Sequence, residues 1–315
     1  MLNRRLLRVK VMQILYAHYQ HSETSIGNSE KELFHSISKS LDLYYLYILL
    51  ILEVRDYAMG RIEYGRNKKL ASSDELNPNT RFITNKVLSK LADCDDVRTY
   101  LDQKGNNWAN HKEVVKSLYA HIVDSQQYKD YMIAEGSSFE LDKKFIAKLF
   151  EKVIAYFEPI YSTFEEQSIY WNDEVEFVLS MVVKTVKTLD EEVPPKLMDT
   201  FKDDDDEEFV KRLFRKAAVN HNDYLAMIKK HSKNWEVERV AFLDIVLMQL
   251  ALAELIEFSE IPVKVSMNEY IEIAKHYSTE KSGQFINGIL DKAILELKET
   301  NQIKKTGKGL MDGEK

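Results

Sequence analysis

The stretch IPVKVSMNEYIEIAKHYSTEKSGQFINGILD, residues 261–291, indicates two successive helices. Pro262 cannot extend a preceding helix, because its ring fixes φ and its nitrogen carries no hydrogen to donate. Ser266 and Glu269 have the spacing of a capping box, which predicts that a helix opens one residue after the serine. The polar segment 277–282 favours a break, and apolar residues recur at helical spacing after it. This part of the chain is therefore expected to form two helices joined by a short polar turn.

Glycine and proline are scarce in the chain, with 10 Gly and 5 Pro among 315 residues. Average usage is about 7% and 5%, so folds with many tight turns are disfavoured and an all-α fold is expected. The length permits a large core and roughly two domains. The single cysteine, Cys94, excludes an internal disulfide framework and fits a reducing compartment. The net charge of -7 does not by itself indicate a nucleic-acid partner.

Two apolar stretches, residues 43–52 and 240–256, suggest membrane spans at first sight. The first is too short to cross a bilayer. The second carries Asp244, Gln249 and Glu254, which would be costly in lipid. The basic N-terminus is followed by an amphipathic rather than a uniformly apolar run, so no signal peptide is expected. We therefore predict a cytoplasmic protein without a membrane segment.

The N-terminus is locally basic. Arg4, Arg5, Arg8 and Lys10 form a run of cations on a helix that we predict over residues 3–21. On a helical wheel, Arg4 and Arg8 fall close to the apolar face. We expect the first turns to project beyond the bundle, with the arginines solvated and available to a ligand. An ordinary charged helix start is the alternative, although cations there oppose the helix macrodipole.

Helical patterns continue through the centre of the chain. Ser29 and Glu32 have capping-box spacing and predict a long helix that ends at about Gly60. The segment from residue 62 to residue 195 has no recognisable chemistry. Its helices are predicted near residues 81–91, 112–124, 141–157 and 173–189.

The last third of the chain begins with an acidic run, residues 203–208. We expect this run to start a helix, because acids stabilise helix N-termini. A later helix over residues 237–257 is apolar nearly all round and should lie at the centre of a bundle. Within it, Asp244 requires either an internal partner or an exposed interface position. Residues 302–315 predict a disordered tail.

No catalytic motif is present in the sequence. A Gly-rich phosphate loop, HExxH, GxSxG and CxxC are all absent. His18 and His21 lie three residues apart on the predicted helix and could share a metal, but a pair at the helix rim is favoured over a metal site. The sequence therefore predicts no catalytic residue, no metal site and no cofactor.

Two segments carry a more specific pattern. One is the basic helix RRLLRVKVMQILYAHYQ, residues 4–20, and the other is residues 235–294. In these segments the chain resembles the NusB family of bacterial transcription antitermination factors. The resemblance implies an all-α fold of two packed three-helix bundles, here with an additional inserted helical region. The second segment carries most of it, in Asp244, Ala251, Glu254, Leu255, Pro262, Val265, Asn268, Glu269, Ala274, Lys275, Phe285, Asn287, Gly288 and Asp291.

The resemblance divides the chain into four parts. Residues 1–61 are expected to form N-terminal NusB-like helices with a basic, RNA-binding start. Residues 62–200 are a helical insertion of unknown role. Residues 201–298 are expected to form the C-terminal NusB-like bundle, and residues 299–315 a disordered tail.

The resemblance also implies a non-enzymatic role in RNA binding. NusB proteins pair with NusE, the free form of a small-subunit ribosomal protein, and bind the single-stranded boxA element of ribosomal RNA transcripts. The complex joins the RNA polymerase elongation complex and promotes processive elongation. By position, Asp244 matches the acid that faces the protein partner. The residues expected at the RNA surface are Arg4, Arg5, Arg8, Lys10, Gln13, Tyr16, Lys281, Gln284 and Phe285.

Several positions depart from the family pattern. Gln249 stands where an arginine is usual, and Ala253 stands where a tyrosine is common, so the contacts with the protein partner are open. Lys10 and Lys281 make the expected RNA face more basic than usual. We therefore expect appreciable RNA affinity in the absence of the partner.

Two other classes of function are compatible with the sequence. Some ribosomal RNA cytosine methyltransferases carry a NusB-like domain, but the catalytic domain that follows it in those enzymes has no counterpart here. The second alternative is a helical protein-binding scaffold that acts through the insertion. RNA binding would distinguish it from the antitermination factor.

Overall fold

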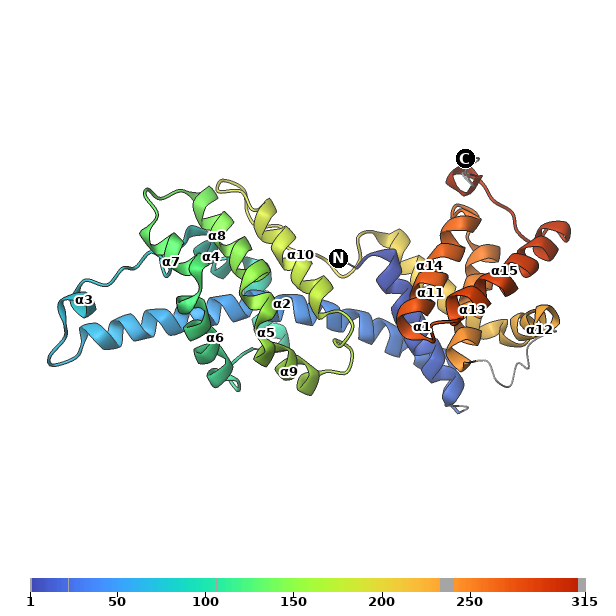
Figure 1. The fold of residues 1–315 in the computed structure, drawn as a ribbon, viewed down its shortest axis with the longest axis horizontal. Helices are drawn as coiled ribbons and strands as arrows, with labels where there is room; N and C mark the ends of the chain where they lie inside the picture. Colours follow the sequence, from blue (N-terminus) through green and yellow to red (C-terminus); the bar gives the residue numbers. More distant parts are fainter. Residues whose placement is uncertain (1, 22, 106, 233–240, 311–315) are drawn as a thin grey trace. The chain divides into compact units, whose positions relative to one another are not determined.

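The computed structural model describes residues 2–21, 23–105, 107–232 and 241–310. In these ranges all regular structure is α-helix or short 3-10 helix, without a strand, which confirms the all-α fold (Figure 1). The chain divides into two compact units. Unit 1 comprises residues 38–200, and unit 2 comprises residues 2–37 together with the chain from Phe201 onward.

The division falls inside one long helix, α2 (Ile26–Arg66). Its first part belongs to unit 2 and the remainder to unit 1, whereas the expected domain boundary lay at residue 61. The physical reason is the apolar density of the helix, because Leu43 to Leu52 are buried in the core of unit 1 with the inserted helices. Tyr44 and Tyr47 are part of this core, so they are not available to stack on a ligand.

The first helix, α1 (Arg4–Gln20), begins as predicted, with the Asn3 side chain accepting the backbone N–H of Leu6 at 2.9 Å. The second helix begins earlier than predicted. Ser25 Oγ accepts the N–H of Asn28 at 3.2 Å and takes the capping position. Ser29 lies buried inside α2 with its Oγ 2.8 Å from Nδ1 of His18, so the expected capping box at Ser29 is wrong.

Unit 1 is anchored on α2 by two tryptophans. The indole N–H of Trp108 donates to the carbonyl of Leu46 at 2.9 Å, and that of Trp171 donates to the carbonyl of Lys39 at 2.7 Å.

The prediction of a helix over 112–124 is confirmed. The helices of unit 1 after α2 are α3 (Ser73–Leu76), α4 (Lys86–Ala92), α5 (Asp95–Lys104), α6 (Lys112–Asp124), α7 (Gln126–Ile133), α8 (Phe139–Lys152), the 3-10 helix η1 (Ile154–Tyr156), α9 (Glu158–Gln167) and α10 (Val175–Thr188).

Unit 2 is built around α13, which packs against α1, α11, α12, α14 and α15. Its burial on nearly all sides confirms the predicted central position, while residues 237–240 of the predicted helix lie outside the described part of the chain. The acidic run does start a helix, because Asp203 Oδ1 accepts the N–H of Asp206 at 3.1 Å. The helices of unit 2 after α1 are α11 (Asp204–Val219), α12 (His221–His231), α13 (Phe242–Glu257), α14 (Val263–Tyr277) and α15 (Ser282–Glu299).

The stretch 261–291 forms two helices with the predicted break between them, but α14 begins at Val263, with Pro262 in the N-cap position. Ser266 and Glu269 therefore lie inside the helix and do not cap it. Their side chains bond to other helices of unit 2 instead, as described below.

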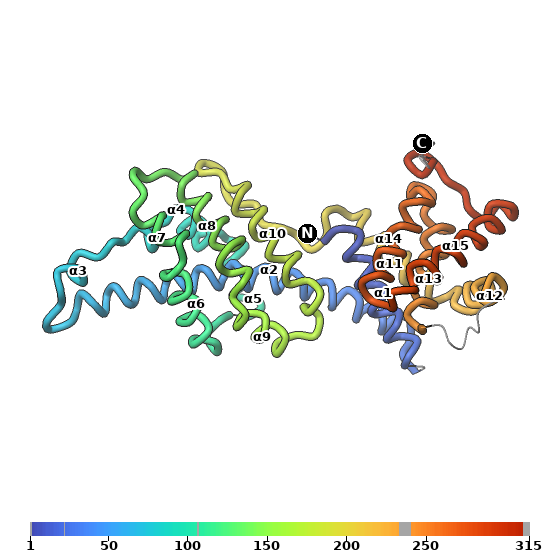
Figure 2. Tube along the Cα trace, viewed as in Figure 1, coloured from blue at the N-terminus to red at the C-terminus, as the bar shows by residue number. Residues whose placement is uncertain are grey.

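The end of the chain is not a disordered tail over its described part. After α15, Asn301 adopts a left-handed conformation with φ 53°, which reverses the chain. Thr306 N then donates to the carbonyl of Ser259 at 2.9 Å, in the connection between α13 and α14. A 3-10 helix, η3 (Gly307–Leu310), follows. Figure 2 traces this return from the end of α15.

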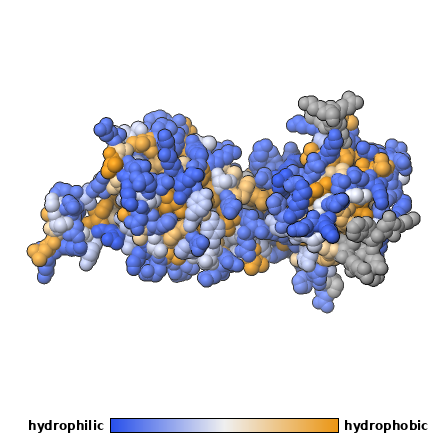
Figure 3. Space-filling view, in the orientation of Figure 1, coloured by the Kyte–Doolittle hydropathy of each residue, from blue (hydrophilic) through white to orange (hydrophobic). Residues whose placement is uncertain are grey.

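The surface drawn in Figure 3 is hydrophilic over most of the visible face of each unit, with apolar areas between the hydrophilic residues. Within the described ranges, no helix combines the length and the apolar character needed to cross a bilayer. The two apolar stretches noted in the sequence are accounted for by the cores of the units, because Leu43 to Leu52 and most of α13 are buried.

Candidate nucleic-acid interface

Arg8 lies in the interior of unit 2, with a side chain that is 3% exposed. Its Nε and Nη2 each donate to a carboxylate oxygen of Glu254 at 2.7 Å. The same carboxylate accepts Ser266 Oγ at 2.7 Å and the hydroxyl of Tyr270 at 2.9 Å. Burial lowers the pKa of Arg8, but the bonds and charge of Glu254 outweigh it and the pKa is raised. The guanidinium is therefore charged and paired with Glu254, with Nη1 3.7 Å from Glu269, and the expectation that Arg8 is solvated is wrong.

Arg4 and Arg5 are also paired, but they remain partly exposed. Arg4 Nε donates to Asp206 at 2.9 Å, and its side chain is 38% exposed. Arg5 donates to both carboxylate oxygens of Glu269, at 2.8 and 2.7 Å, and is 50% exposed. The hydrogen bond from Arg5 lowers the pKa of Glu269. The start of α1 is thus packed against α11 and α14 and does not project, because acids on those helices meet its arginines.

These arginines line a hollow of about 660 Å³ in unit 2, which we call the arginine hollow. Apolar side chains from the start of α14 form part of its wall, and cations from α1 and from the chain end form another part. Its lining residues are Asn3, Arg4, Arg5, Arg8, Glu260, Ile261, Pro262, Val265, Glu269 and Lys308.

A second hollow of unit 2, of about 590 Å³, lies further along α1, and we call it the aromatic hollow. Tyr16 is 39% exposed there and packs edge-on against Phe242, with ring centroids 5.1 Å apart. Gln13 is half-buried beside it. The structure thus brings Gln13 and Tyr16 to the end of α14. The lining residues are Met12, Gln13, Tyr16, Ala241, Phe242, Leu243, Tyr277, Ser278 and Thr279.

The other residues expected at the RNA surface differ in exposure. Lys10 is 2% exposed, so it lies in the interior and is not presented to a ligand. Lys281 is exposed in the turn before α15, and Gln284 is exposed in the first turn of that helix. Phe285 is half-buried beside Gln284 in the sequence. These residues follow Tyr277, Ser278 and Thr279, which line the aromatic hollow. The structure therefore keeps Lys281 and Gln284 accessible and removes Lys10 from the surface.

Asp244 has internal partners and does not lie at an exposed interface position. It is 4% exposed, and its two carboxylate oxygens accept Ser278 Oγ at 2.6 Å and Ser282 Oγ at 2.8 Å. Its place in the first turn of α13 also favours a negative charge. The carboxylate holds the turn between α14 and α15, which differs from the partner-facing position that the resemblance implied.

The two departures in α13 are also internal. Gln249 is fully buried, and its Oε1 lies 3.2 Å from Nδ1 of His221 on the neighbouring α12. Ala253 is fully buried as well. These substitutions therefore change the packing of the central helix and not an exposed contact surface.

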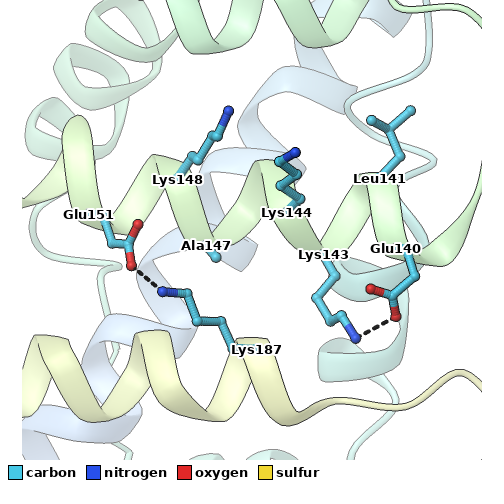
Figure 4. A pocket seen from close by; sticks show the side chains of 8 residues that line it. All are labelled: Glu140, Leu141, Lys143, Lys144, Ala147, Lys148, Glu151 and Lys187. Carbon is cyan, nitrogen blue, oxygen red and sulfur yellow. Dashed lines mark hydrogen bonds and ion pairs between the residues drawn. The ribbon is translucent and has the colours of Figure 1, made fainter.

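Unit 1 has a hollow of its own, of about 580 Å³, between α8 and α10 (Figure 4). Two of its lysines pair with acids at 2.5 Å, Lys143 with Glu140 and Lys187 with Glu151. The exposed Lys144 and Lys148 point away from α10. We call this site the lysine hollow. Its lining residues are Glu140, Leu141, Lys143, Lys144, Ala147, Lys148, Glu151 and Lys187.

Sequence reasoning missed the acids that hold the arginines. A signal was nevertheless present, because the helical wheel had placed Arg8 on the core side of α1 and Glu254 stands in the most apolar helix of the chain. Two charges forced toward one core predict a pair. Metal chemistry has no candidate in the described ranges, where no group of three His, Cys, Asp or Glu side chains is placed to hold an ion.

Comparison with known proteins relates the segment from α10 to α15 to a family. The NusB family model matches residues 174–295, which begin just before α10 and extend into α15. This part of the chain is similar to the NusB family. The transcription antitermination protein NusB of Salinibacter ruber is 43% identical over 104 residues, and that of Chloroherpeton thalassium is 44% identical over 105 residues. NusB of Natranaerobius thermophilus is 34% identical over 90 residues.

The matches to NusB proteins cover a limited share of both partners. They span 33%, 33% and 29% of this chain, and 65%, 50% and 65% of the three relatives in the same order. The chain thus covers between half and just under two thirds of the length of these relatives. The family-model match does not include α1, and no solved structure matches the chain.

Proposed function

We propose that this protein is a non-enzymatic, cytoplasmic RNA-binding factor in transcription antitermination. The NusB domain over residues 174–295 and the names of the related proteins support this role. We further propose that its RNA ligand is single-stranded and of the boxA type, and that it acts with a NusE-type ribosomal protein and the RNA polymerase elongation complex.

The observation that carries the RNA-binding proposal is that α1 and α14 together line both hollows of unit 2. Pro262, Val265 and Glu269 near the start of α14 line the arginine hollow, and Tyr277 at its end lines the aromatic hollow. From Arg5 to Tyr16, α1 rises by about 16 Å at 1.5 Å per residue, which is a distance of a few nucleotides. A seam with cations at one end and aromatic faces at the other suits a single strand.

Roles within this seam follow from exposure. Arg4 and Arg5 are proposed to contact phosphates, because their side chains are 38% and 50% exposed. Tyr16 is proposed to stack on a base, since its ring is 39% exposed above Phe242. Arg8 and Lys10 are internal and are proposed to support the helix rather than to bind RNA.

The remaining positions extend the seam past the aromatic hollow. Lys281 and Gln284 are exposed where α15 begins, and we propose that they contact RNA together with Phe285. The docking surface for the ribosomal partner is proposed to lie outside Asp244, whose oxygens are already bonded to Ser278 and Ser282.

The test is a titration of fluorescent single-stranded boxA-type RNA at several salt concentrations, with variants of opposite expected sign. Arg5→Ala removes a phosphate contact and should flatten the slope of log K against log salt by about 0.7. Glu269→Gln removes the acid that competes for Arg5, so affinity should rise.

The matched control is Arg215→Ala on α11. Arg215 is 52% exposed and pairs with Glu30, so it repeats the chemistry of Arg5 away from both hollows. Its RNA affinity should equal that of the wild type. If the wild-type protein does not bind the RNA at low salt, or if the two arginine variants lose affinity equally, the proposed interface is wrong.

A further inference from the structure

The chain end forms a strap over the connection between α13 and α14. Residues 302–310, which we call the C-terminal strap, are fixed at several points. Lys305 Nζ donates to the carbonyl of Phe258 at 2.8 Å, and Thr306 N donates to that of Ser259 at 2.9 Å. The hydroxyls of Thr306 and Ser259 lie 3.1 Å apart. The composition of the C-terminal strap is typical of disorder, but these hydrogen bonds fix its position on the connection between α13 and α14.

Two glycines allow this close approach. Gly307 has a φ of 52°, in the left-handed region that favours glycine. Gly309 is buried, and a Cβ added to it would overlap the carbonyl group of Ser259. A side chain at position 309 would thus force the strap away from the connection.

The strap places one charged side chain, Lys308, in the wall of the arginine hollow. The three arginines of this hollow are paired, with Asp206, Glu269 and Glu254. Lys308 differs from them, because it is exposed and forms no ion pair with any residue in the described ranges. It is therefore the lining cation whose charge is least compensated.

We propose that the C-terminal strap is part of the RNA-binding surface and holds Lys308 as a phosphate contact in the arginine hollow. This inference rests on the proposed RNA-binding function. An anion that enters the hollow would have to compete with carboxylates for Arg4 and Arg5, whereas no carboxylate in the described ranges forms an ion pair with Lys308. Lys308 thus provides the first contact for a phosphate, and the arginines complete the site.

The experiment compares three variants of the full chain in the same RNA titration. Lys308→Gln removes the charge and should lower affinity about fivefold at about 0.1 M salt, with a slope flatter by about 0.7. Gly309→Ala keeps the charge but displaces the strap, so it should cause a similar loss. The double variant Lys308→Gln, Gly309→Ala should bind RNA with an affinity no lower than that of the single variant with the lower affinity. Lys304→Gln removes an exposed strap charge that does not line the hollow, and its affinity should stay near wild type.

Thermal unfolding of each variant shows whether unit 2 is intact. If the wild type binds RNA and Lys308→Gln binds equally well, the strap proposal is wrong and the proposed function stands. If Lys304→Gln loses as much affinity as Lys308→Gln, general charge explains the effect and the strap proposal fails. If Gly309→Ala binds like the wild type, the placement of Lys308 by the strap is refuted. If the wild type itself does not bind RNA, both proposals fail.

Discussion

The arginine hollow of unit 2 and the lysine hollow of unit 1 are both cationic, but they are built differently. The partners of Arg4, Arg5 and Arg8 lie more than 200 positions away in the sequence, and two of the pairs are bidentate. In the lysine hollow the pair of Lys143 is with Glu140 on the same helix. The arginines therefore join parts of the chain that are more than 200 residues apart, while the pair of Lys187 and Glu151 joins two helices only 36 residues apart and is partly exposed. The number of charges in a segment does not by itself distinguish these two uses; their position relative to the apolar face of the helix does.

The sharpest way to break this comparison is to remove one partner of the buried pair. Arg8→Ala leaves the Glu254 carboxylate buried without its cation, and we expect a loss of about 3–5 kcal/mol in the free energy of unfolding. Urea unfolding monitored by circular dichroism measures it. The double variant Arg8→Met, Glu254→Leu should recover part of the loss, because no unpaired charge remains, although Ser266 and Tyr270 lose their acceptor. A stability of Arg8→Ala near wild type would show that the pair is not buried.

A smaller loss is expected where a buried acid has only neutral donors. Asp244→Ala removes the acceptor of Ser278 and Ser282, so two hydroxyls lose a partner, and we expect a cost of about 1–3 kcal/mol. Hydrogen exchange should rise first at residues 278–282, since the carboxylate holds that turn. If exchange in the turn is unchanged while global stability falls, the proposed local role of Asp244 is wrong.

The exposed pair of Arg5 and Glu269 should add a dependence on pH. The pKa of Glu269 is lowered from its usual value of 4.5, mainly by the hydrogen bond from Arg5. Its stabilisation is therefore present above pH 4.5 and is lost as the pH falls through the lower folded-state value. Stability curves of the wild type and Glu269→Gln should differ at neutral pH and converge in acid. A difference that persists unchanged at about pH 3 would contradict this linkage.

The smallest effects are expected in the lysine hollow. Lys187→Ala breaks an exposed pair with Glu151, and pairs of this kind contribute about 0–1 kcal/mol. The double variant Lys144→Ala, Lys148→Ala should change stability by at most about 0.5 kcal/mol, because both side chains are exposed. Chemical unfolding under the conditions used for Arg8→Ala gives the direct contrast. A loss as large as that of Arg8→Ala would remove the distinction between the two hollows.

Much of the helical architecture is predictable from local patterns. Asn3 caps α1, the helix over 112–124 is found with its predicted limits, and the break before α15 is where hydroxyl and small residues favour it. In each case the signal and the group that it satisfies lie within a few residues, so local sequence contains the whole interaction.

The predictions that failed involve side chains with a choice between near and distant partners. Ser266 and Glu269 have the spacing to cap a helix, but they bond instead to Glu254 and Arg5 on other helices. Ser29 similarly meets His18. Spacing alone cannot rank these partners, because the distant ones become available only when the helices pack. The same limit hid the C-terminal strap, whose composition is polar but which bonds to the carbonyls of Phe258 and Ser259 and to the Ser259 hydroxyl.

The pairing of Arg8 with Glu254 also has a consequence for synthesis. The two residues are 246 positions apart, so at about 5–20 residues per second the arginine emerges on the order of 10–50 seconds before its partner. Residues 38–200 form a continuous segment with its own core. We expect this segment to fold before Glu254, the partner of Arg8 in α1, has been synthesised. During that interval Arg8 has no Glu254 carboxylate to pair with, because α13 has not yet been synthesised.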